Sequence, residues 1–408
     1  MAIPTRDELV DALRATPGAA RLLDVVGDIP GVHLVGGVPR DLLLGRPPLD
    51  LDLVVEGDGP AVAAIIADRM GGTAVTHDRV ATAVVSAGDM VFDVASARAE
   101  EYRQPGALPD VRPARLEEDL QRRDFSVNAI AIALWAAELG RVRALPSALE
   151  DLEAHRLRVL HAGSFHDDPT RLLRLVRYAT RLGFAIEPET AGLAREAAGA
   201  GALATVSAAR IGSELRLALA EESAVAALML AGSLGIAAAL HPGFTVDAAI
   251  AGRALALLPA DGRRDLLVLA VACRAMGGPD LAGWLDGMEF RGPDRDEVID
   301  AVTAPAVLSA RLAAATQPSQ IAAAAAGHPP ATVALAGALG AERAARAWLD
   351  DLRHVRVDIA GADLLAAGVA QGPDVGRALA AALAARLDGG AEDRAAQLRA
   401  ALAAVGRE

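Results

Sequence analysis

Lysine is absent from this sequence, and cysteine and aromatic residues are scarce. All 40 basic side chains are arginine, Cys273 is the single cysteine, and aromatic residues make up 3% of the 408 residues. One cysteine excludes a disulfide within the chain and fits a reducing compartment, which predicts a cytoplasmic protein. The planar arginine fork donates two hydrogen bonds at once, so the basic residues that are present suit phosphates and bases.

The sequence also lacks a secretory signal and a membrane-spanning run. Residues 1–7 contain no apolar segment of the kind that a signal peptide needs. The longest suspicious uncharged run, residues 223–240, is mostly alanine and is interrupted by glycine and serine. Such a composition indicates buried helices rather than a span, and we expect no membrane partner.

An excess of acidic side chains gives the chain a formal net charge of −13 at pH 7. This charge argues against a generic nucleic-acid binder, and no DNA partner is expected, although a local arginine face leaves RNA binding open. With 53% hydrophobic residues, the chain is long enough to form two or more packed domains. Its abundance of alanine and leucine predicts that much of it is helical.

The stretch from residue 34 to residue 55 has the most informative pattern. A short apolar strand turns through Gly36 and Gly37 into a helix over residues 38–44, and a second strand follows over residues 49–55. Asp50 and Asp52 are two apart on that strand, so they point to the same face. Neighbouring carboxylates repel each other unless cations neutralise them, and two hard cations form the usual clamp for in-line displacement at phosphorus.

The glycine pair allows two interpretations. Gly36 and Gly37 have no Cβ, so a phosphate can approach the backbone closely just before a helix begins. Taken alone, the pair equally fits a tight turn between a strand and a helix. The combination of the glycine pair with the two aspartates at this spacing favours the phosphate-binding interpretation.

Residues 36–53 read GGVPRDLLLGRPPLDLDL, which resembles the signature of the class II tRNA nucleotidyltransferase and poly(A) polymerase family. The resemblance implies an α+β fold, in which a head domain with a mixed β-sheet precedes an all-helical remainder. We expect the catalytic head at residues 1–148, a helical neck at 149–240, and an RNA-binding body and tail at 241–408. The resemblance also implies that Arg40 contacts the nucleotide.

The same resemblance implies a metal site. Asp50 and Asp52 would hold two Mg²⁺ ions, and Asp93 would be the third catalytic acid. Residues 82–86 and 90–94 are predicted to form two strands of a hairpin, with Asp93 on the second. The residues alone fit equally well an aspartate at the end of a strand in a turn.

A second motif, RRDFSVNA, occupies residues 122–129 and closely resembles another motif of the family. Arg122 and Arg123 could hold triphosphate oxygens in charge-assisted hydrogen bonds. Asp124 could orient an arginine or the ribose, and Asn128 could bond the sugar or the backbone. An ordinary helix start with acidic residues in its first turn is the alternative for this segment alone.

A third motif, DDPTR, spans residues 167–171 and resembles the segment with which the family reads the incoming base. We expect Asp168 to cap a helix whose first residue is Pro169. Asp168 and Arg171 could together read an amine beside a ring acceptor, which C and A present and G and U do not. A cap with an ion pair is the alternative. We also count Arg174 and Arg177, on the same helix, as nucleotide-binding residues.

The segment over residues 100–113 contains Pro105, Gly106 and Pro109 and is expected to be a loop. In the family, a flexible loop here helps to switch the site from C to A, whereas a solvated charged loop is the alternative for any one residue.

Together these patterns predict a template-independent enzyme that restores the 3′-terminal CCA of tRNA from CTP and ATP and releases pyrophosphate. Addition of only A or only CC, and poly(A) synthesis, remain alternatives within the family. A non-catalytic RNA-binding protein on the same fold is the alternative from another class.

Overall fold

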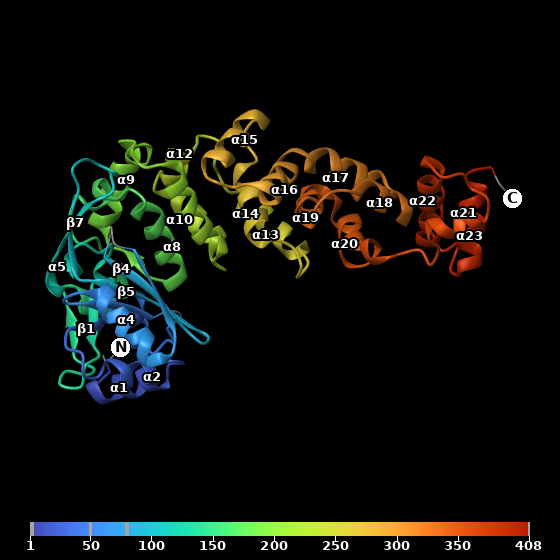
Figure 1. The fold of residues 1–408 in the computed structure, drawn as a ribbon. Coiled ribbons are helices and arrows are strands. Elements are labelled where there is room, and N and C mark those ends of the chain that lie inside the picture. The colour runs from blue at the N-terminus through green and yellow to red at the C-terminus, as the bar shows by residue number, and fades with distance from the viewer. Residues whose placement is uncertain (1–3, 49–50, 78–80, 407–408) are drawn as a thin grey trace. The chain divides into compact units, whose positions relative to one another are not determined.

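The structure is a computed structural model that describes residues 4–48, 51–77 and 81–406. The chain divides into two compact units, which are described separately below (Figure 1). The first unit contains the residues up to Ser207 together with Leu234–Ala239, and the second contains Ala208–Ser233 and the residues from Leu240 onward. Only the first unit contains strands among the described residues, so the predicted α+β fold with a mixed sheet and a helical remainder is confirmed.

The first unit contains a seven-stranded sheet with the strand order β3-β4-β5-β2-β1-β8-β9. Strands β2 and β5 run parallel, and the other neighbouring strands are antiparallel. The strands are β1 Val32–Leu34, β2 Leu51–Val55, β3 Thr73–His77, β4 Thr82–Ala87, β5 Met90–Ser96, β8 Ile130–Ala133 and β9 Val142–Ala144.

One face of this sheet is covered by helix α4, Gly59–Met70. Val62 and Ile66 of this helix are buried, as are Ala83 on β4 and Val94 on β5. Buried and exposed residues alternate along β4 and β5, which is the period-two pattern of a half-buried strand. The buried set packs under α4, and the alternate set points to the opposite face.

That opposite face is covered only in part. Helix α5, Leu116–Gln121, packs Leu116 and Leu120 against Val54 of β2 and Ala97, which follows β5. These contacts lie at the carboxyl ends of β2 and β5. The residues nearer the amino ends of the two strands, including Asp52 and Asp93, therefore lie beyond the α5 contact.

The rest of the first unit consists of short helices and two small sheets. The predicted helix over residues 38–44 is confirmed as α3. The elements are α1 Arg6–Ala15, α2 Ala19–Val26, α3 Gly37–Leu43, β6 Arg98–Glu101, β7 Asp110–Pro113, η2 Ser126–Asn128, α6 Ala148–Glu153, β10 Arg156–Leu157, α7 Ser164–Asp167, α8 Arg171–Leu182, β11 Ala185–Ile186, α9 Pro188–Gly199 and η3 Ala202–Thr205.

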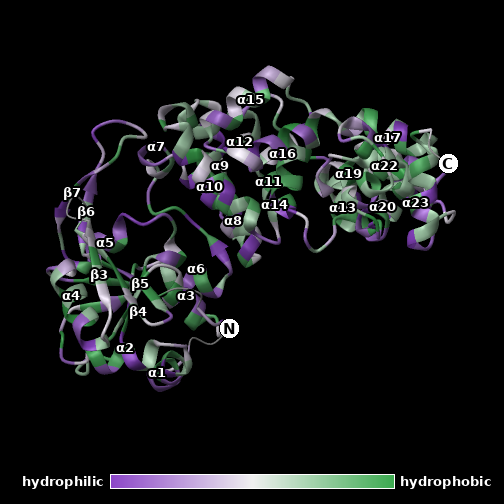
Figure 2. Ribbon diagram, turned by 45° about the vertical axis from the view of Figure 1, so that its right-hand side comes forward, coloured by the Kyte–Doolittle hydropathy of each residue, from purple (hydrophilic) through white to green (hydrophobic). Residues whose placement is uncertain are grey.

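The second unit is helical throughout its described part, and α12, Ile236–Leu240, lies where the chain passes between the units. Separate apolar clusters hold its helices together, and Figure 2 shows green, hydrophobic ribbon over much of them. The helices are α10 Ala208–Ala220, α11 Ala224–Ser233, α13 Ala248–Leu257, α14 Arg264–Cys273, α15 Gly278–Gly287, α16 Gly292–Thr303, α17 Pro305–Ala314, α18 Pro318–Ala325, α19 Pro330–Ala336, η4 Gly337–Ala341, α20 Glu342–Asp350, η5 Leu352–His354, α21 Gly361–Ala366, α22 Pro373–Leu387 and α23 Arg394–Ala403.

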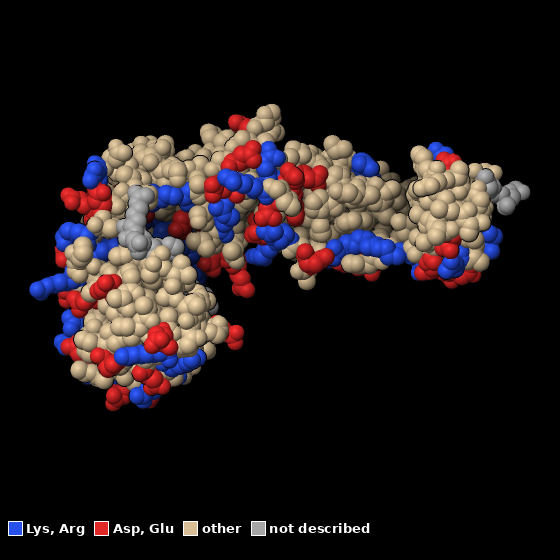
Figure 3. Space-filling view, in the orientation of Figure 1, with Lys and Arg blue, Asp and Glu red and all other residues tan. Residues whose placement is uncertain are grey.

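No helix in the described part of the chain is long and apolar enough to cross a membrane. In the view of Figure 3, arginine and carboxylate side chains are interspersed, and much of the surface carries neither. Many of these charges are paired, as in the ion pairs between Arg263 and Asp294 and between Arg353 and Asp261. Interspersed charges of both signs are consistent with binding that depends on local arginine clusters rather than on the net charge.

Candidate active site

Two of the predicted catalytic carboxylates lie on neighbouring parallel strands, and one of them, Asp52, lines the candidate site. Asp52 on β2 is the register partner of Asp93 on β5. Leu51 and Leu53 are buried, whereas Asp52 is half-buried and Asp93 is exposed. Because neighbouring strands are about 4.8 Å apart and register partners share a face, the two carboxylates lie side by side. Asp93 thus lies within a strand beside Asp52 rather than in a turn.

These carboxylates fit a divalent cation, which prefers oxygen ligands. Gly36 approaches the same place, since a Cβ added there would lie 3.2 Å from Asp52 Oδ2. Asp50 falls outside the described residues, so its pairing with Asp52 stays a prediction. Within the described ranges, no group of three or more histidine, cysteine, aspartate or glutamate side chains is placed to hold a metal ion. A cation at Asp52 and Asp93 would need Asp50, water or substrate phosphate as further ligands.

The glycine turn connects the carboxylates to the arginines. Gly36 has a φ of +73°, and a Cβ on it would also lie 3.7 Å from Arg123 Nη1. The left-handed conformation and the two close neighbours both favour glycine at this position. The turn is therefore tight, and the side chains of Asp52 and Arg123 both lie next to Gly36.

A buried aspartate holds the arginine pair in place. Asp119 is fully buried and accepts hydrogen bonds from Arg122 Nη2 at 2.7 Å and from Arg123 Nη2 at 2.8 Å. Burial works against the charged form of Asp119, but the two arginines outweigh it and hold the pKa of this carboxyl below its usual range. Burial lowers the pKa of Arg123, and the negative charge of Asp119 partly offsets this lowering. Asp119 therefore fixes the position of both guanidinium groups at the site.

The expectation of a loop over residues 100–113 is partly wrong, because the two ends of this segment belong to strands β6 and β7, which pair as a hairpin. Glu100 on this hairpin accepts a 2.8 Å hydrogen bond from Arg122 Nη1, and the Tyr102 hydroxyl donates to its other oxygen at 2.9 Å. Gly106 N donates to the carbonyl of His166 at 3.1 Å. The hairpin is thus tied to Arg122 at its base and to the segment before α8 at its tip.

Asp124 is the second buried carboxylate of the site. Its Oδ2 accepts from Arg174 Nε at 2.9 Å and from Arg174 Nη2 at 2.7 Å, and its Oδ1 accepts from Asn128 Nδ2 at 2.9 Å. Although burial opposes the charged form, Arg174 and Asn128 hold the pKa of Asp124 at about 2. Asp124 therefore orients Arg174, which is one of the two roles predicted for it, and it is ionised at neutral pH.

Arg40 and Arg177 lie behind the site rather than on its surface. Arg40 is 2% exposed, pairs with Asp41 at 2.8 Å, and donates from Nη1 to Asn128 Oδ1 at 2.7 Å. The guanidinium groups of Arg40 and Arg177 lie 5.6 and 4.6 Å from the ring centroid of Tyr178. Both predicted nucleotide-binding arginines thus support the residues that do line the cavity, since neither lines it.

Asp168 and Arg171 of the third motif line the same cavity, but the helix that follows begins later than expected. Helix α8 starts at Arg171, and Asp168 directly follows the last residue of α7, so the expectation that Asp168 caps a helix beginning at Pro169 is wrong. Asp168 Oδ1 instead accepts from the backbone N–H of Thr170 at 3.1 Å and from its hydroxyl at 2.6 Å. The Pro169 ring sits in the turn between the two helices, where its missing N–H leaves no gap in a ladder.

Arg171 is held from two sides. Its Nη1 bonds the Ser164 hydroxyl at 2.6 Å, and its Nη2 donates to the carbonyl of Arg122 at 2.7 Å. The residue is 5% exposed, so its guanidinium is oriented by the protein before any ligand arrives. Each Nη carries two hydrogens, which leaves donors available beyond these two bonds.

These residues surround one cavity of about 330 Å³. It is lined by most of the predicted nucleotide-binding residues and by three that the sequence did not single out: Glu100, Tyr102 and Tyr178. The sequence signal for Glu100 was only a run of mixed charge, and the two tyrosines had no distinguishing pattern. The lining residues are Gly36, Gly37, Asp52, Glu100, Tyr102, Arg122, Arg123, Asp124, Asn128, Asp168, Arg171, Arg174 and Tyr178.

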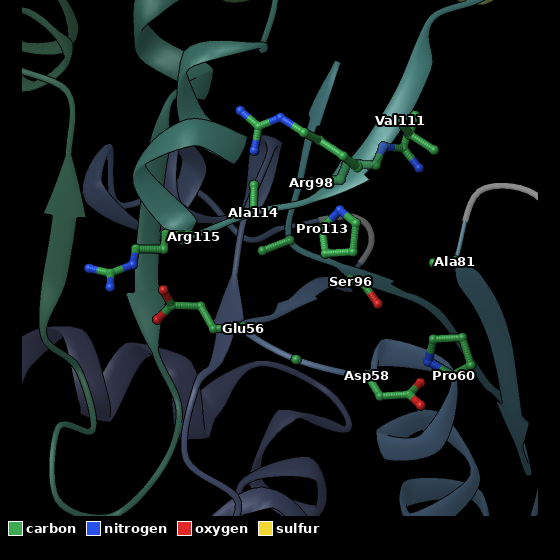
Figure 4. A pocket seen from close by; sticks show the side chains of 13 residues that line it. Glu56, Asp58, Pro60, Ala81, Ser96, Arg98, Val111, Pro113, Ala114 and Arg115 are labelled. Atoms are coloured by element: carbon green, nitrogen blue, oxygen red, sulfur yellow. The ribbon is translucent and has the colours of Figure 1, made fainter. Parts of the chain in front are cut away.

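A larger cavity of about 920 Å³ lies at the opposite, carboxyl ends of β2 and β5, and Figure 4 shows its lining. Its polar groups are engaged in local structure: Ser96 Oγ accepts from Gly59 N at 2.9 Å, and Glu56 Oε1 accepts from Leu116 N at 3.0 Å. Asp58 caps α4 through Ala61 N. The smaller cavity has the converging charges, so we take it as the candidate active site.

Comparisons with known proteins agree with this geometry. Residues 32–158 match the family described as "Poly A polymerase head domain", and residues 183–247 match "Probable RNA and SrmB-binding site of polymerase A". The chain is 43% identical over 221 residues to an A-adding tRNA nucleotidyltransferase of Halalkalibacterium halodurans, an alignment that covers 52% of each chain. It is 42% identical over 190 residues to a CC-adding tRNA nucleotidyltransferase of Deinococcus radiodurans, covering 46% of this chain and 50% of that protein.

The matched segment spans about half the length of these two relatives. The likeness to solved structures extends further: the Thermotoga maritima CCA-adding enzyme, solved in complex with tRNA, superposes with a TM-score of 0.81 at 26% identity. That superposition covers 99% of this chain and all of the other. The fold and the site define a nucleotidyltransferase-type head followed by helices. Residues 32–158 match the poly(A) polymerase head-domain family, and the chain is similar to tRNA nucleotidyltransferases in sequence and fold.

Proposed function

We propose that this protein adds nucleotides to the 3′ end of tRNA, using CTP and ATP and releasing pyrophosphate. One observation carries the proposal: Asp52, Arg123 and Arg171 line a single cavity of about 330 Å³. A carboxylate for a cation, a buried arginine for phosphates and a fixed arginine for a base are the three elements that nucleotidyl transfer needs. A poly(A) polymerase would need the same elements, so the nucleotide preference decides between the two.

The triphosphate would lie between the glycine turn and the arginines. Arg123 and Asp52 flank Gly36, so phosphates bound beside Gly36 would contact both the arginine and the cations. Two Mg²⁺ ions, held by Asp50, Asp52 and Asp93, would neutralise the pyrophosphate and lower the pKa of the attacking hydroxyl. Asp119 keeps Arg122 and Arg123 from turning away before the nucleotide binds, which limits the entropy lost on binding.

The base would be read by Asp168 and Arg171. A carboxylate accepts from the exocyclic amine of C or A, and a guanidinium donates to the adjacent ring nitrogen. U and G present a carbonyl and a ring N–H there, which would leave the buried Arg171 donor facing another donor. Ser164 and the Arg122 carbonyl fix the orientation of Arg171. The guanidinium would therefore not turn to accommodate U or G.

Complete CCA addition is the reaction that we propose to test first, and addition of A alone is the second candidate. The second is favoured by the 43% identity to an A-adding enzyme. The test uses tRNA ending at the discriminator base, at C or at CC, each with CTP alone, ATP alone or both. Full addition predicts extension of all three RNAs to CCA. Extension of only the CC-ending RNA by a single A would identify an A-adding enzyme.

Homopolymer tails in the same assay would favour poly(A) synthesis instead. A protein that binds the RNAs but extends none of them would favour the non-catalytic alternative.

A further inference from the structure

The face of the sheet that carries Asp52 and Asp93 continues onto strands β4 and β3. Val84 on β4 is the register partner of Asp93, and Val75 on β3 is the register partner of Val84. One row across four strands therefore reads Val75, Val84, Asp93, Asp52. Register partners share a face, so the two valines point to the same side as the carboxylates.

This row is open to solvent and mainly apolar at its outer end. Val75 is 60% exposed and Val84 is half-buried. Val91 on β5, two residues before Asp93, shares the face and is 63% exposed. Ser86, opposite Val91, is exposed as well. We call Val75, Val84, Ser86 and Val91 the valine shelf.

We propose that the valine shelf seats the terminal nucleotide of the acceptor RNA, with a base or ribose packed on the valines. The inference rests on the proposed function and adds the location of the second substrate. The cavity that would hold the incoming triphosphate lies on the Gly36 and Arg123 side of Asp52. In-line displacement requires the attacking 3′ oxygen to approach from the side opposite the leaving pyrophosphate.

The shelf lies on that opposite side. Strand spacing places Val84 about 5 Å and Val75 about 10 Å beyond Asp93, on the side away from Asp52, which matches the dimensions of a single nucleotide. The exposed valines form an apolar surface on which any base or ribose can pack, and Ser86 offers a hydroxyl to ribose or phosphate. Such a seat tolerates a terminal nucleotide that changes as the RNA grows.

The test compares Val75→Glu and Val91→Asn with Ile65→Glu. Ile65 lies on α4, which covers the other face of the sheet, and is 40% exposed, so it controls for added charge on the same unit. We measure the KM for tRNA, the Kd of CTP and ATP with Mg²⁺, and the sedimentation coefficient. The shelf predicts a KM for tRNA raised at least fivefold in both shelf variants, with nucleotide Kd values within twofold of wild type and Ile65→Glu unchanged.

An unchanged KM for tRNA in both shelf variants, while the wild type is active, would overturn the shelf and leave the proposed function standing. A change in sedimentation without a change in KM would also overturn it, since the face would then be an interface between copies. Failure of the wild type to extend any RNA would instead overturn the proposed function. Both shelf substitutions are at partly or largely exposed positions, so we expect the variants to fold.

Discussion

Arg171 Nη2 donates a 2.7 Å hydrogen bond to the backbone carbonyl of Arg122, which lies 49 residues earlier in the chain. The bond joins the proposed base-reading arginine on α8 to the segment that presents the proposed phosphate-binding arginines. Glu100 and Asp119 hold the Arg122 side chain, so both ends of the nucleotide site share one hydrogen-bond network. Substitutions of residues within one such network are expected to have non-additive effects on free energy.

Substitution of either carboxylate of the Asp52 and Asp93 pair is expected to abolish transfer without unfolding the protein. Asp52→Asn and Asp93→Asn each remove a negative charge from an adjacent pair, and for Asp93→Asn the melting temperature is expected to stay equal or rise. We expect turnover with Mg²⁺ to fall at least about 100-fold, since about 2.7 kcal/mol of transition-state stabilisation gives that factor. Asp89→Asn, in the exposed turn between β4 and β5, is the matched control. Near-normal turnover of both site variants would show that the metal assignment is wrong.

Loss of Asp119 is expected to reduce stability strongly. Asp119→Ala leaves two mostly buried arginines without their shared carboxylate, and breaking a buried ion pair from one side costs about 3–5 kcal/mol. Urea unfolding of the wild type and the variant measures the difference in the free energy of unfolding. Glu118→Ala, whose exposed carboxylate pairs at the surface with Arg112, is the control and is expected to change stability much less than Asp119→Ala. Equal changes in the two variants would contradict the role of Asp119.

Asp124 predicts a specific dependence of stability on pH. Its pKa is about 2 in the folded protein, below the ordinary value, so its contribution is complete above about pH 4. That contribution, on the order of 2–3 kcal/mol, is lost as the pH falls from about 4 towards 2. The unfolding free energy of Asp124→Asn should therefore be lower at pH 7 and should decline less between pH 5 and pH 3. Parallel pH profiles for variant and wild type would refute this account.

Base selection is expected to depend on Ser164 as well as on Arg171. Arg171→Ala should reduce incorporation of C and A and raise relative tolerance for U or G, with about 1–3 kcal/mol of discrimination lost. Ser164→Ala removes one of the two bonds that orient Arg171 and should shift the preference in the same direction by a smaller amount. The readout is incorporation of all four nucleotides at a temperature where every protein is folded. A less stable Arg171→Ala with an unchanged preference would reduce Arg171 to a structural role.

Local patterns predicted the parts of the site that depend on strand alternation and glycine turns. The half-buried Asp52 between the buried Leu51 and Leu53, and the turn at Gly36, follow from the sequence because each depends on neighbouring residues. The pairing of Asp52 with Asp93 does not, because the register of two parallel strands 41 residues apart is set by the whole sheet. Family resemblance supplied Asp93, whereas the residues alone left it open.

Side-chain partners over long sequence distances could not be predicted. Arg40 carries a family motif, yet it is buried against Asp41 and Asn128 instead of lining the cavity. Glu100 and Tyr102 were assigned to a charged loop, but cross-strand pairing in the β6–β7 hairpin brings them into the site. The contacts from Arg40 to Asn128 and from Glu100 to Arg122 join residues distant in sequence, which local propensity does not encode.

The most direct test of the account is pyrophosphate release from CTP and ATP with two matched RNAs. One is tRNA lacking its terminal CCA with a 3′ hydroxyl, and the other is the same RNA ending in a 3′-deoxy nucleotide. We expect pyrophosphate release in step with RNA extension for the first RNA and none above background for the second, with UTP and GTP inactive on both. Equal pyrophosphate release from the two RNAs would contradict nucleotidyl transfer to an RNA 3′ end, and none from either RNA with any nucleotide would contradict complete CCA addition.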